Sequence, residues 1–278
     1  PTNNTDFRYK FQPNYTQLAD GEGVCIPPYK VHINSHGFRD HEYNKEKPEN
    51  VFRIVTLGDS ITMGHGVELN ETYSKVLQRL LNNRSENVTY QVLNFGFPGY
   101  NLQEKEEVFH SKVVEFNPDV IVLQYLPDDL YNWTRFEMFE RKALREYKRA
   151  HNLERVSDMG LRIAHLNANK MYMRYLERMH RKKPEKVEDR LRRYLRKMDR
   201  IYPQRPFLIL APRSFEFSTL EKIADDYGWH VLEMDSAYEG YSEEEVKIHE
   251  KDEHPNALGH RLLALHLHRK LKDMGVLD

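Results

Sequence analysis

Five short apolar runs recur along the chain, and most are followed by a stretch whose apolar residues are spaced three or four apart. The runs are residues 52–57, 89–93, 120–125, 207–211 and 229–233. The third is apolar at consecutive positions, a pattern typical of a parallel strand covered on both faces. The stretches between the runs predict helices at about residues 72–81, 102–116 and 218–227, and a last helix opening near His254. Alternating strands and helices imply a parallel five-stranded sheet between two helical layers, with right-handed crossovers.

Two parts of the chain depart from this alternation. Residues 1–50 are polar and irregular apart from a short alternating piece at 29–33, and we expect them to pack as a lead-in on a main domain of residues 51–278. Residues from about 135 to 203 interrupt the alternation between the third and fourth runs. Apolar residues are frequent enough there to pack. Two or three inserted helices are therefore expected, the clearest at about 186–201 after a break at Pro184.

Charge is distributed very unevenly between the insertion and the rest of the chain. Residues 135–200 hold 21 Lys/Arg against 10 Asp/Glu, so the remainder must carry about −12 for a net charge of −1. Such a stretch is most often a solvated helical face. Its functional alternatives are peripheral contact with an anionic membrane or with a polyanion such as an acidic glycan. Tyrosines interleave with the charges, but no recognised nucleic-acid module accompanies them, so no nucleic-acid partner is expected.

Three features bear on where the protein works. Cys25 is the single cysteine, which leaves no internal disulfide and decides nothing about the compartment. No run approaches 18 apolar residues, and no signal peptide is recognised. Six N-x-S/T sequons occur where about one is expected by chance. They begin at Asn3, Asn14, Asn70, Asn83, Asn87 and Asn132. The excess predicts an extracellular or cell-surface protein, such as the soluble part of an anchored one, with a cytoplasmic location as the alternative.

The end of the first strand carries the main candidate for chemistry. Gly58-Asp59-Ser60 follows residues 52–57 directly, and a helix is expected soon after it. A strand that stops at a glycine and delivers a serine onto a turn exposes the hydroxyl near a helix N-terminus, where negative charge is stabilised. The competing interpretation is an ordinary N-cap, because Asp and Ser are preferred capping residues.

Other candidates follow the second and third strands. Gly99 lies in a loop with Gly96 and Pro98, and Asp128 follows the third strand. The carboxyl ends of parallel strands meet at one edge of a sheet, where ligands bind in such folds. Ser60, Gly99 and Asp128 are therefore expected at one edge, which favours the nucleophile interpretation.

Together these motifs resemble the SGNH (GDSL-type) hydrolase superfamily. Residues 58–62 match its first block, 94–99 its second and 252–256 its last, and 33–40 are similar to segments that precede the first block in microbial members. The resemblance covers about residues 30–130 and 205–275, and it assigns no motif to the basic insertion. It implies a flavodoxin-like three-layer α/β/α fold and a Ser–His–Asp site.

The resemblance also implies a role for each site residue. Ser60 would be the nucleophile, His254 the base and Asp252 the acid that orients the imidazole. The N–H groups of Ser60 and Gly99 would form the oxyanion hole. Asp128 stands where the family has an asparagine donor. An ionised Asp128 only accepts hydrogen bonds and would repel an oxyanion. Either it is held protonated, or a donor such as Asn101 or Asn132 replaces it, or activity is reduced or lost.

A second departure concerns the acid. The family's usual acid precedes the histidine by three residues, where Lys251 stands here, and Asp252 precedes it by two. Glu253 and a Ser–His dyad are the alternatives. A metal held by His249, His254 and His260 would need a geometry that spacing does not reveal, and His254 would otherwise only cap the last helix. His260, His266 and His268 are expected to be core or surface histidines. No metal or cofactor is expected.

The predicted function is a serine esterase that hydrolyses, or transfers, a short acyl group such as acetyl from a glycan or small ester through an acyl-serine intermediate. No extensive apolar lid is evident, which argues against long-chain lipid substrates. The alternative is a catalytically weak SGNH-fold binding or scaffold protein that acts at a surface glycan or anionic membrane.

Overall fold

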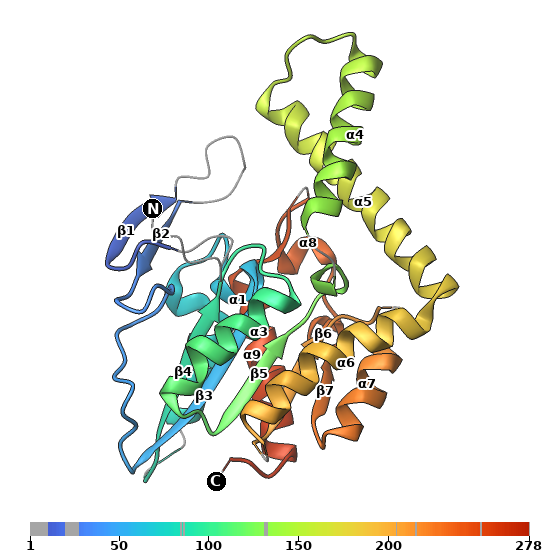
Figure 1. The fold of residues 1–278 in the computed structure, drawn as a ribbon. Helices are drawn as coiled ribbons and strands as arrows, with labels where there is room; N and C mark the ends of the chain where they lie inside the picture. The colour runs from blue at the N-terminus through green and yellow to red at the C-terminus, as the bar shows by residue number, and fades with distance from the viewer. Residues whose placement is uncertain are drawn as a thin grey trace.

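A five-stranded parallel sheet with the strand order β4-β3-β5-β6-β7 forms the centre of the computed structural model (Figure 1). The structure describes residues 11–19, 28–83, 85, 87–130, 133–203, 205–214, 216–250 and 252–277. The strands are β3 (Val51–Gly58), β4 (Thr89–Gly96), β5 (Val120–Gln124), β6 (Phe207–Ala211) and β7 (His230–Glu233). All four pairings are parallel. The predicted α/β fold with a five-stranded parallel sheet is therefore confirmed.

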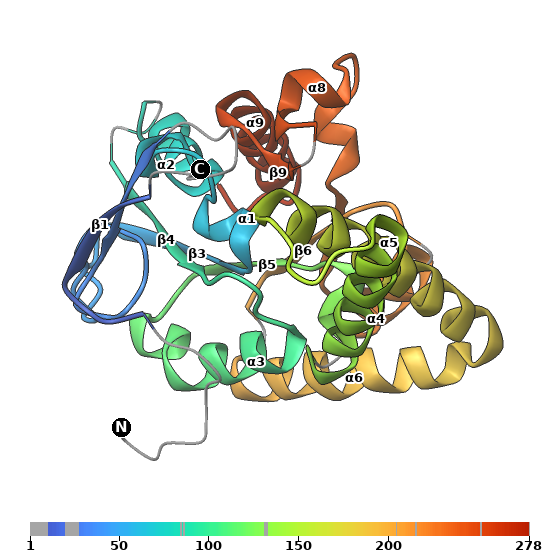
Figure 2. The same cartoon turned by 90° about the horizontal axis from the view of Figure 1, so that it is seen from above.

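Side chains of the sheet alternate between two apolar layers. In β5, Val120 and Val122 pack in one layer, and Ile121 and Leu123 pack in the other. Figure 2 shows α2 and α9 on one side of the sheet and α3 and α6 on the other. The helices that pack on the sheet are α2 (Tyr73–Asn82), α3 (Leu102–Ser111), α6 (Pro184–Ile201), α7 (Phe217–Asp226) and α9 (Ala257–Asp273). Because both faces are covered, the consecutive apolar residues of β5 all find apolar neighbours.

The lead-in contains a two-stranded antiparallel hairpin, β1 (Tyr15–Ala19) with β2 (Tyr29–Ile33). The short strand expected at 29–33 is β2. Beyond it, Phe38 joins the core layer on the α3 side, and Asp40 pairs with the buried Lys75 of α2 at 2.5 Å. Residues 28–50 thus pack on the main domain.

The region before the last helix differs from the expectation. Residues 240–252 were expected to be a loop, with the helix opening at His254. Instead α8 (Glu243–Val246) is followed by a hairpin of β8 (Lys247–His249) and β9 (Asp252–Pro255), and α9 begins at Ala257. Asn256 is the N-cap of α9, its side chain accepting the N–H of Gly259 at 3.0 Å. His254 is therefore a strand residue, and the capping role proposed for it is wrong.

Between β5 and β6 the chain forms α4 (Trp133–His151), α5 (Asp158–Lys182) and α6. Pro184 stands in the first turn of α6, where its missing N–H costs nothing. We call α4 and α5 the helical arm. The arm is a helical hairpin that projects from the body in Figure 1, with small and aromatic residues such as Ala143 and Tyr172 buried. In the described part of the chain, no helix has the length and apolar character needed to cross a membrane.

Candidate active site

The turn after β3 presents Ser60 at the carboxyl edge of the sheet. Gly58 leaves no room for a side chain, because a Cβ there would lie 2.1 Å from Thr62 Oγ1 and 2.4 Å from Gln124 Oε1. Asp59 is the N-cap of the short helix α1 (Ser60–Met63) and accepts the N–H of Ile61 at 2.9 Å. The capping interpretation is therefore correct for Asp59, while Ser60 is the first helical residue.

Ser60 and His254 are in hydrogen-bond contact although 194 residues separate them. Ser60 Oγ lies 2.7 Å from His254 Nε2, and His254 Nδ1 lies 2.5 Å from Asp252 Oδ1. Asp252 Oδ1 also accepts the backbone N–H of His254 at 3.1 Å. The structure brings these three residues together in the order Ser–His–Asp.

The strand β9 explains why an acid two residues before the histidine works. Residues two apart in a strand lie on the same side, so Asp252 and His254 project together. Glu253 occupies the alternate position and is exposed. Asn256 fixes this strand by donating from its side chain to the carbonyls of Glu245 at 2.8 Å and Lys247 at 2.9 Å. Lys251, at the family's usual acid position, lies outside the described residues.

Hydrogen bonding keeps Asp252 ionised. Burial works against its charge, but the hydrogen bonds from His254 and the nearby imidazole of His65 outweigh it and hold the pKa of this carboxyl below its usual range. A permanently ionised carboxylate fixes the proton on His254 Nδ1 and leaves Nε2 free to accept the proton of Ser60. The arrangement has the chemistry of an activated serine nucleophile.

Comparison with known proteins identifies the family of the chain. The model of the GDSL-like lipase/acylhydrolase family matches residues 56–262, a span that contains all three residues. The chain belongs to this family. It is therefore a GDSL-type carboxylic ester hydrolase by descent, and no curated protein sequence matches it.

Solved structures agree in fold. LAE5, an α/β hydrolase from the metagenome of Lake Arreo, Spain, is 15% identical with a TM-score of 0.50 over 82% of this chain and 96% of its own. A two-domain esterase (CEX) active on acetylated mannans, co-crystallised with mannopentaose, is 14% identical with a TM-score of 0.51 over 81% of this chain. The match spans 50% of that esterase. These similarities extend the fold assignment across most of the GDSL-family chain.

The loop after β4 brings Gly99 to the same edge of the sheet. Gly58 and Gly96 are paired in the β3–β4 register, and the N–H of Phe97 donates to the carbonyl of Gly58 at 3.1 Å. Gly99 has φ of 72°, a conformation that favours glycine. The N–H of Ser60 is the first of α1, where the helix itself supplies no acceptor. The two expected backbone donors, the N–H groups of Ser60 and Gly99, thus lie in the turns that follow the neighbouring strands β3 and β4.

The third strand end holds Asp128 and Asp129 in the 3₁₀ turn η3 (Pro127–Leu130), and the two have different surroundings. Asp129 is buried, accepts the N–H of Leu126 at 2.9 Å and pairs with Lys105. Asp128 is exposed to solvent, but neighbouring protein atoms crowd its carboxyl group and remove part of its hydration. This crowding and the negative charge of Asp59 raise the pKa of Asp128, with Lys105 acting in the opposite direction.

The alternative oxyanion donors fare differently. Asn101 is the N-cap of α3, and its side chain accepts the N–H of Glu104 at 3.0 Å in a capping box. Asn132 lies outside the described residues. The carbonyl end of Asn101 is therefore committed to a structural role.

The three histidines weighed as a possible metal site, His249, His254 and His260, do not form a cluster of ligand atoms in the described part of the chain. His260 is buried and accepts the N–H of Tyr73 at 3.2 Å, and burial lowers its pKa to about 3, so it is a core histidine. His266 contacts the carbonyl of Glu233 at 3.0 Å. Among the described residues, the only group with three potential ligand atoms within 4.8 Å is His65, Asp252 and His254. Two of these belong to the Ser–His–Asp arrangement, and their mutual hydrogen bond uses His254 Nδ1.

Three residues of this region were not predicted as part of the site. His65 faces Asp252. Lys105 lies between the carboxylates of Asp59 and Asp129. Gln124 bonds both the backbone N–H and the carboxylate of Asp59. His65 had a local signal, since a histidine between two glycines five residues after the candidate serine is unusual. Lys105 and Gln124 had none, because their partners are distant in sequence.

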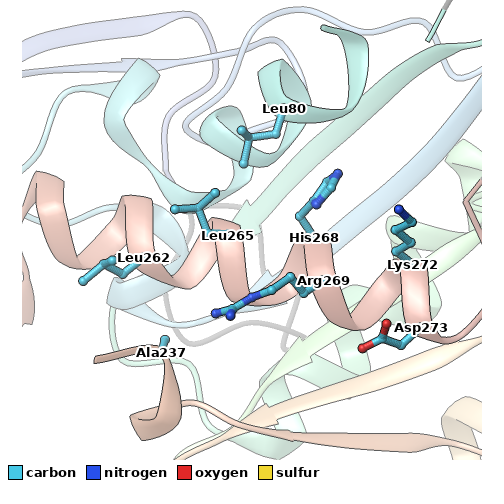
Figure 3. Close-up of a pocket in the computed structure, with 8 residues that line it drawn as sticks. All are labelled: Leu80, Ala237, Leu262, Leu265, His268, Arg269, Lys272 and Asp273. Atoms are coloured by element: carbon cyan, nitrogen blue, oxygen red, sulfur yellow. The ribbon is translucent and has the colours of Figure 1, made fainter. Parts of the chain in front are cut away.

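A groove of about 560 Å³ lies on the outer side of α9 (Figure 3). Its residues come from α2, α9 and the 3₁₀ turn η4 (Asp235–Tyr238). They are Leu80, Ala237, Leu262, Leu265, His268, Arg269, Lys272 and Asp273. None of them belongs to the Ser–His–Asp arrangement, so this groove is separate from the candidate active site.

Proposed function

We propose that the protein is a serine esterase that removes a short acyl group, such as acetyl, through an acyl-Ser60 intermediate. The observation that carries the proposal is the contact of Ser60 Oγ with His254 Nε2 at 2.7 Å, with Asp252 on the other ring nitrogen.

In the first half-reaction His254 takes the proton of Ser60, and Oγ attacks the ester carbonyl. The N–H groups of Ser60 and Gly99 would stabilise the oxyanion, each donor contributing on the order of 10²–10³ in rate. The C–O bond to the alcohol breaks as His254 returns the proton to it. Water, activated by His254, then hydrolyses the acyl-serine and restores the hydroxyl. A sugar hydroxyl in place of water would make the reaction an O-acyl transfer.

We infer a glycan or small ester as substrate. The family supports ester hydrolysis in general, and the structurally similar two-domain esterase is active on acetylated mannans. The sequence contains no extensive apolar stretch suited to cover a long acyl chain. These points support a small acyl group on a polar carrier.

Labelling tests this proposal directly. A serine-directed phosphonate should modify Ser60, identified by mass spectrometry, and Ser60→Ala should lower p-nitrophenyl acetate turnover by about 10⁴-fold or more. Ser111→Ala, which changes an exposed serine of α3, is the matched control and should leave turnover unchanged. A folded protein that is neither labelled at Ser60 nor slowed by Ser60→Ala would contradict the proposal.

The second candidate is a catalytically weak binding protein with the same fold. The specific observation in its favour is Asp128 in the position of the family's asparagine donor. A decayed site and an active site that uses a protonated Asp128 differ in how their response to Asp128→Asn depends on pH. The decayed site should gain turnover at every pH, and the active site only where Asp128 is ionised.

We propose further that the helical arm touches an anionic membrane. Residues 133–182 carry 13 Lys/Arg against 6 Asp/Glu, and most of the described basic side chains are exposed. At the tip, Leu153 and Leu161 are 41% and 46% exposed beside Arg149 and Arg155. Basic side chains around exposed leucines suit a negatively charged surface that accepts apolar side chains.

Vesicle binding separates this proposal from its alternatives. The protein should bind vesicles containing phosphatidylglycerol and not neutral phosphatidylcholine vesicles, and salt should weaken binding. The double substitution Leu153→Ser/Leu161→Ser should weaken binding without affecting esterase turnover. If the wild-type protein and the double variant are retained equally on an acidic polysaccharide, the partner is a polyanion and the membrane proposal is overturned.

We propose that this contact takes place outside the cell. Asn14, Asn70, Asn83 and Asn87, the sequon asparagines within the described residues, are all exposed and so accessible for glycosylation. Expression in a glycosylating secretory host should give a product whose mass falls after N-glycosidase treatment. A secreted product with the unmodified mass would remove this support.

A further inference from the structure

His65 lies in a tight turn that is tied to the nucleophile. The turn follows α1 and has glycines on both sides of His65, Gly64 with φ of 84° and Gly66 with φ of 79°. The backbone N–H of His65 donates to the carbonyl of Ser60 at 3.0 Å. The imidazole of His65 is therefore held at a defined place relative to Ser60.

The ring of His65 connects two further groups. Its Nδ1 lies 3.1 Å from the hydroxyl of Tyr29 in β2, and its Nε2 lies 3.6 Å from Asp252 Oδ2. The ring centroid is 4.6 Å from that of His254. Asp252 thus faces a histidine on each side, His254 at Oδ1 and His65 at Oδ2.

The hydroxyl of Tyr29 selects the tautomer of His65. A phenol that donates to Nδ1 leaves the ring proton on Nε2, which then points at the carboxylate. The ionised carboxylate of Asp252 can only accept, which places the ring proton on Nε2 and leaves Nδ1 to accept from the phenol. Burial raises the pKa of Tyr29, so the phenol keeps the proton that it donates. The hydrogen-bond directions then run consistently from Tyr29 through His65 to Asp252.

Arg39 holds the two parts of this arrangement together. Its guanidinium is fully buried and donates to the carbonyls of Gly64 at 2.5 Å and Val67 at 2.7 Å on the turn, and to that of Lys30 at 2.7 Å on β2. It also lies 5.0 Å from the centre of the Tyr29 ring. One side chain therefore fixes the turn that carries His65 and the strand that carries Tyr29.

We propose that His65 and Tyr29 are positioning residues for Asp252, forming one directional chain of hydrogen-bond and charge contacts, Tyr29–His65–Asp252–His254–Ser60. The inference rests on the proposed esterase function. At 3.6 Å the His65–Asp252 contact is longer than a normal hydrogen bond, and such contacts tighten when substrate is bound. His65 acts through the carboxylate and does not touch the reacting atoms.

The chain has a predictable effect on pH dependence. The charged and titratable groups that face His65 from packed elements are Tyr29 and Arg39 on the β2 side and Asp252 and His254 on β9. Without the donor at Oδ2, the full negative charge of Asp252 acts on His254 and favours its protonated form. Activity requires neutral His254, so the acid limb of kcat/KM should move to higher pH, by roughly half to one unit.

Two substitutions of His65 distinguish the effect of its N–H donor from the effect of its aromatic ring. His65→Phe keeps a ring against His254 and removes the donor, and should show the shifted acid limb with kcat/KM at pH 6 lowered about 3–10-fold. His65→Gln restores an N–H near the position of Nε2 and should return the profile towards that of the wild type. Tyr29→Phe should give a smaller shift in the same direction. His41→Phe, at an exposed histidine of the lead-in, is the matched control.

A proton spectrum gives a readout that does not need activity. The hydrogen-bonded Nδ1 proton of His254 should resonate far downfield, and His65→Phe should displace it while His41→Phe leaves it in place. Superimposable pH profiles and an unmoved resonance in folded His65→Phe would overturn the inference. If wild-type protein is neither labelled nor active but the resonance still moves, the esterase proposal fails and the positioning inference stands.

Discussion

The groups on the two sides of Ser60 differ in how their charges and hydrogen-bonding groups are arranged. On the β9 flank, donors and acceptors alternate from Tyr29 through His65 and Asp252 to His254. On the β5 flank, several carboxyl groups gather around one ammonium, that of Lys105. The first arrangement suits moving a proton along a defined direction, since each group has a complementary neighbour. In the second arrangement carboxyl groups outnumber cations, and burial raises the pKa of Asp129 well above its usual range, with Lys105 acting in the opposite direction.

Lys105 is the centre of the second flank. Its side chain is fully buried, donates to the carbonyl of Gln124 at 3.0 Å, pairs with Asp129 and lies 3.7 Å from Asp59 Oδ2. Gln124 completes the arrangement by donating to Asp59 Oδ2 at 3.1 Å and accepting the N–H of Asp59 at 2.9 Å. The turn that presents Ser60 is therefore supported from below by a buried charge.

Removing that charge should have the largest effect on stability. Lys105→Met leaves Asp59 and Asp129 buried without a cation, and the free energy of unfolding should fall by about 3–5 kcal/mol. The loss should be greater at pH 8 than at pH 4, because protonation relieves unpaired carboxylates. Urea unfolding at the two pH values measures it.

The matched control is Lys45→Met, which breaks the exposed pair of Lys45 with Glu115 at 2.8 Å. An exposed pair of this kind contributes about 0–1 kcal/mol. Equal losses for the two variants would mean that the Lys105 cluster contributes nothing beyond a surface ion pair.

Glu216 extends the β5 flank and should give a pH-dependent effect. The residue is fully buried before α7, and burial, together with the negative charges of Asp128 and Asp129, raises its pKa to about 8. The unfolded chain ionises this carboxyl near 4.5, whereas the folded chain keeps it protonated up to about pH 8. Its favourable contribution is therefore complete below pH 4.5 and is lost as pH rises towards 8.

Glu216→Gln should remove this dependence. Between pH 4.5 and pH 8 the variant should gain stability relative to the wild type by on the order of 3 kcal/mol, as urea unfolding across that range would detect. Glu221→Gln, at an exposed position of the same helix, should track the wild type throughout. A constant difference between Glu216→Gln and wild type at all pH values would mean that Glu216 does not change its protonation on folding.

The β9 flank was more predictable from sequence than the β5 flank. Ser60, Asp252 and His254 lie in short blocks with recognisable order, and the apolar runs placed the sheet that carries Ser60. The hairpin of β8 and β9 was missed because its strands are short and charged, and tertiary contacts such as those of Asn256 determine them. Local pattern cannot reveal a strand whose partner and anchor are both irregular segments.

Lys105 illustrates what the sequence conceals. It stands in a stretch with three glutamates, where a lysine is normally solvent-exposed. Its burial depends on Asp59 and Asp129, which lie 46 and 24 residues away in the chain and meet only because β3 and β5 are neighbours. Asp128 was recognised from its position after the third strand, but its different surroundings from Asp129 followed only from the geometry of η3.

The pH profile of kcat/KM for Asp128→Asn depends on both flanks, on His254 from one and on residue 128 from the other. This substitution is expected to have the smallest effect of those considered. The raised pKa keeps the carboxyl of Asp128 protonated to higher pH than that of an ordinary aspartate, and a protonated carboxyl can donate to the oxyanion as an amide does. Activity would then need neutral His254 and protonated Asp128 together. The profile of kcat/KM would be bell-shaped, with its alkaline limb falling as Asp128 ionises. An asparagine keeps the donor at all pH values, so the variant should lose the alkaline limb and gain activity at the pH values where Asp128 is ionised. A gain of the same size at every pH would instead indicate a site weakened by an acceptor-only Asp128. A uniform loss would show that the carboxyl group itself takes part in the reaction, and that the amide is no substitute for it.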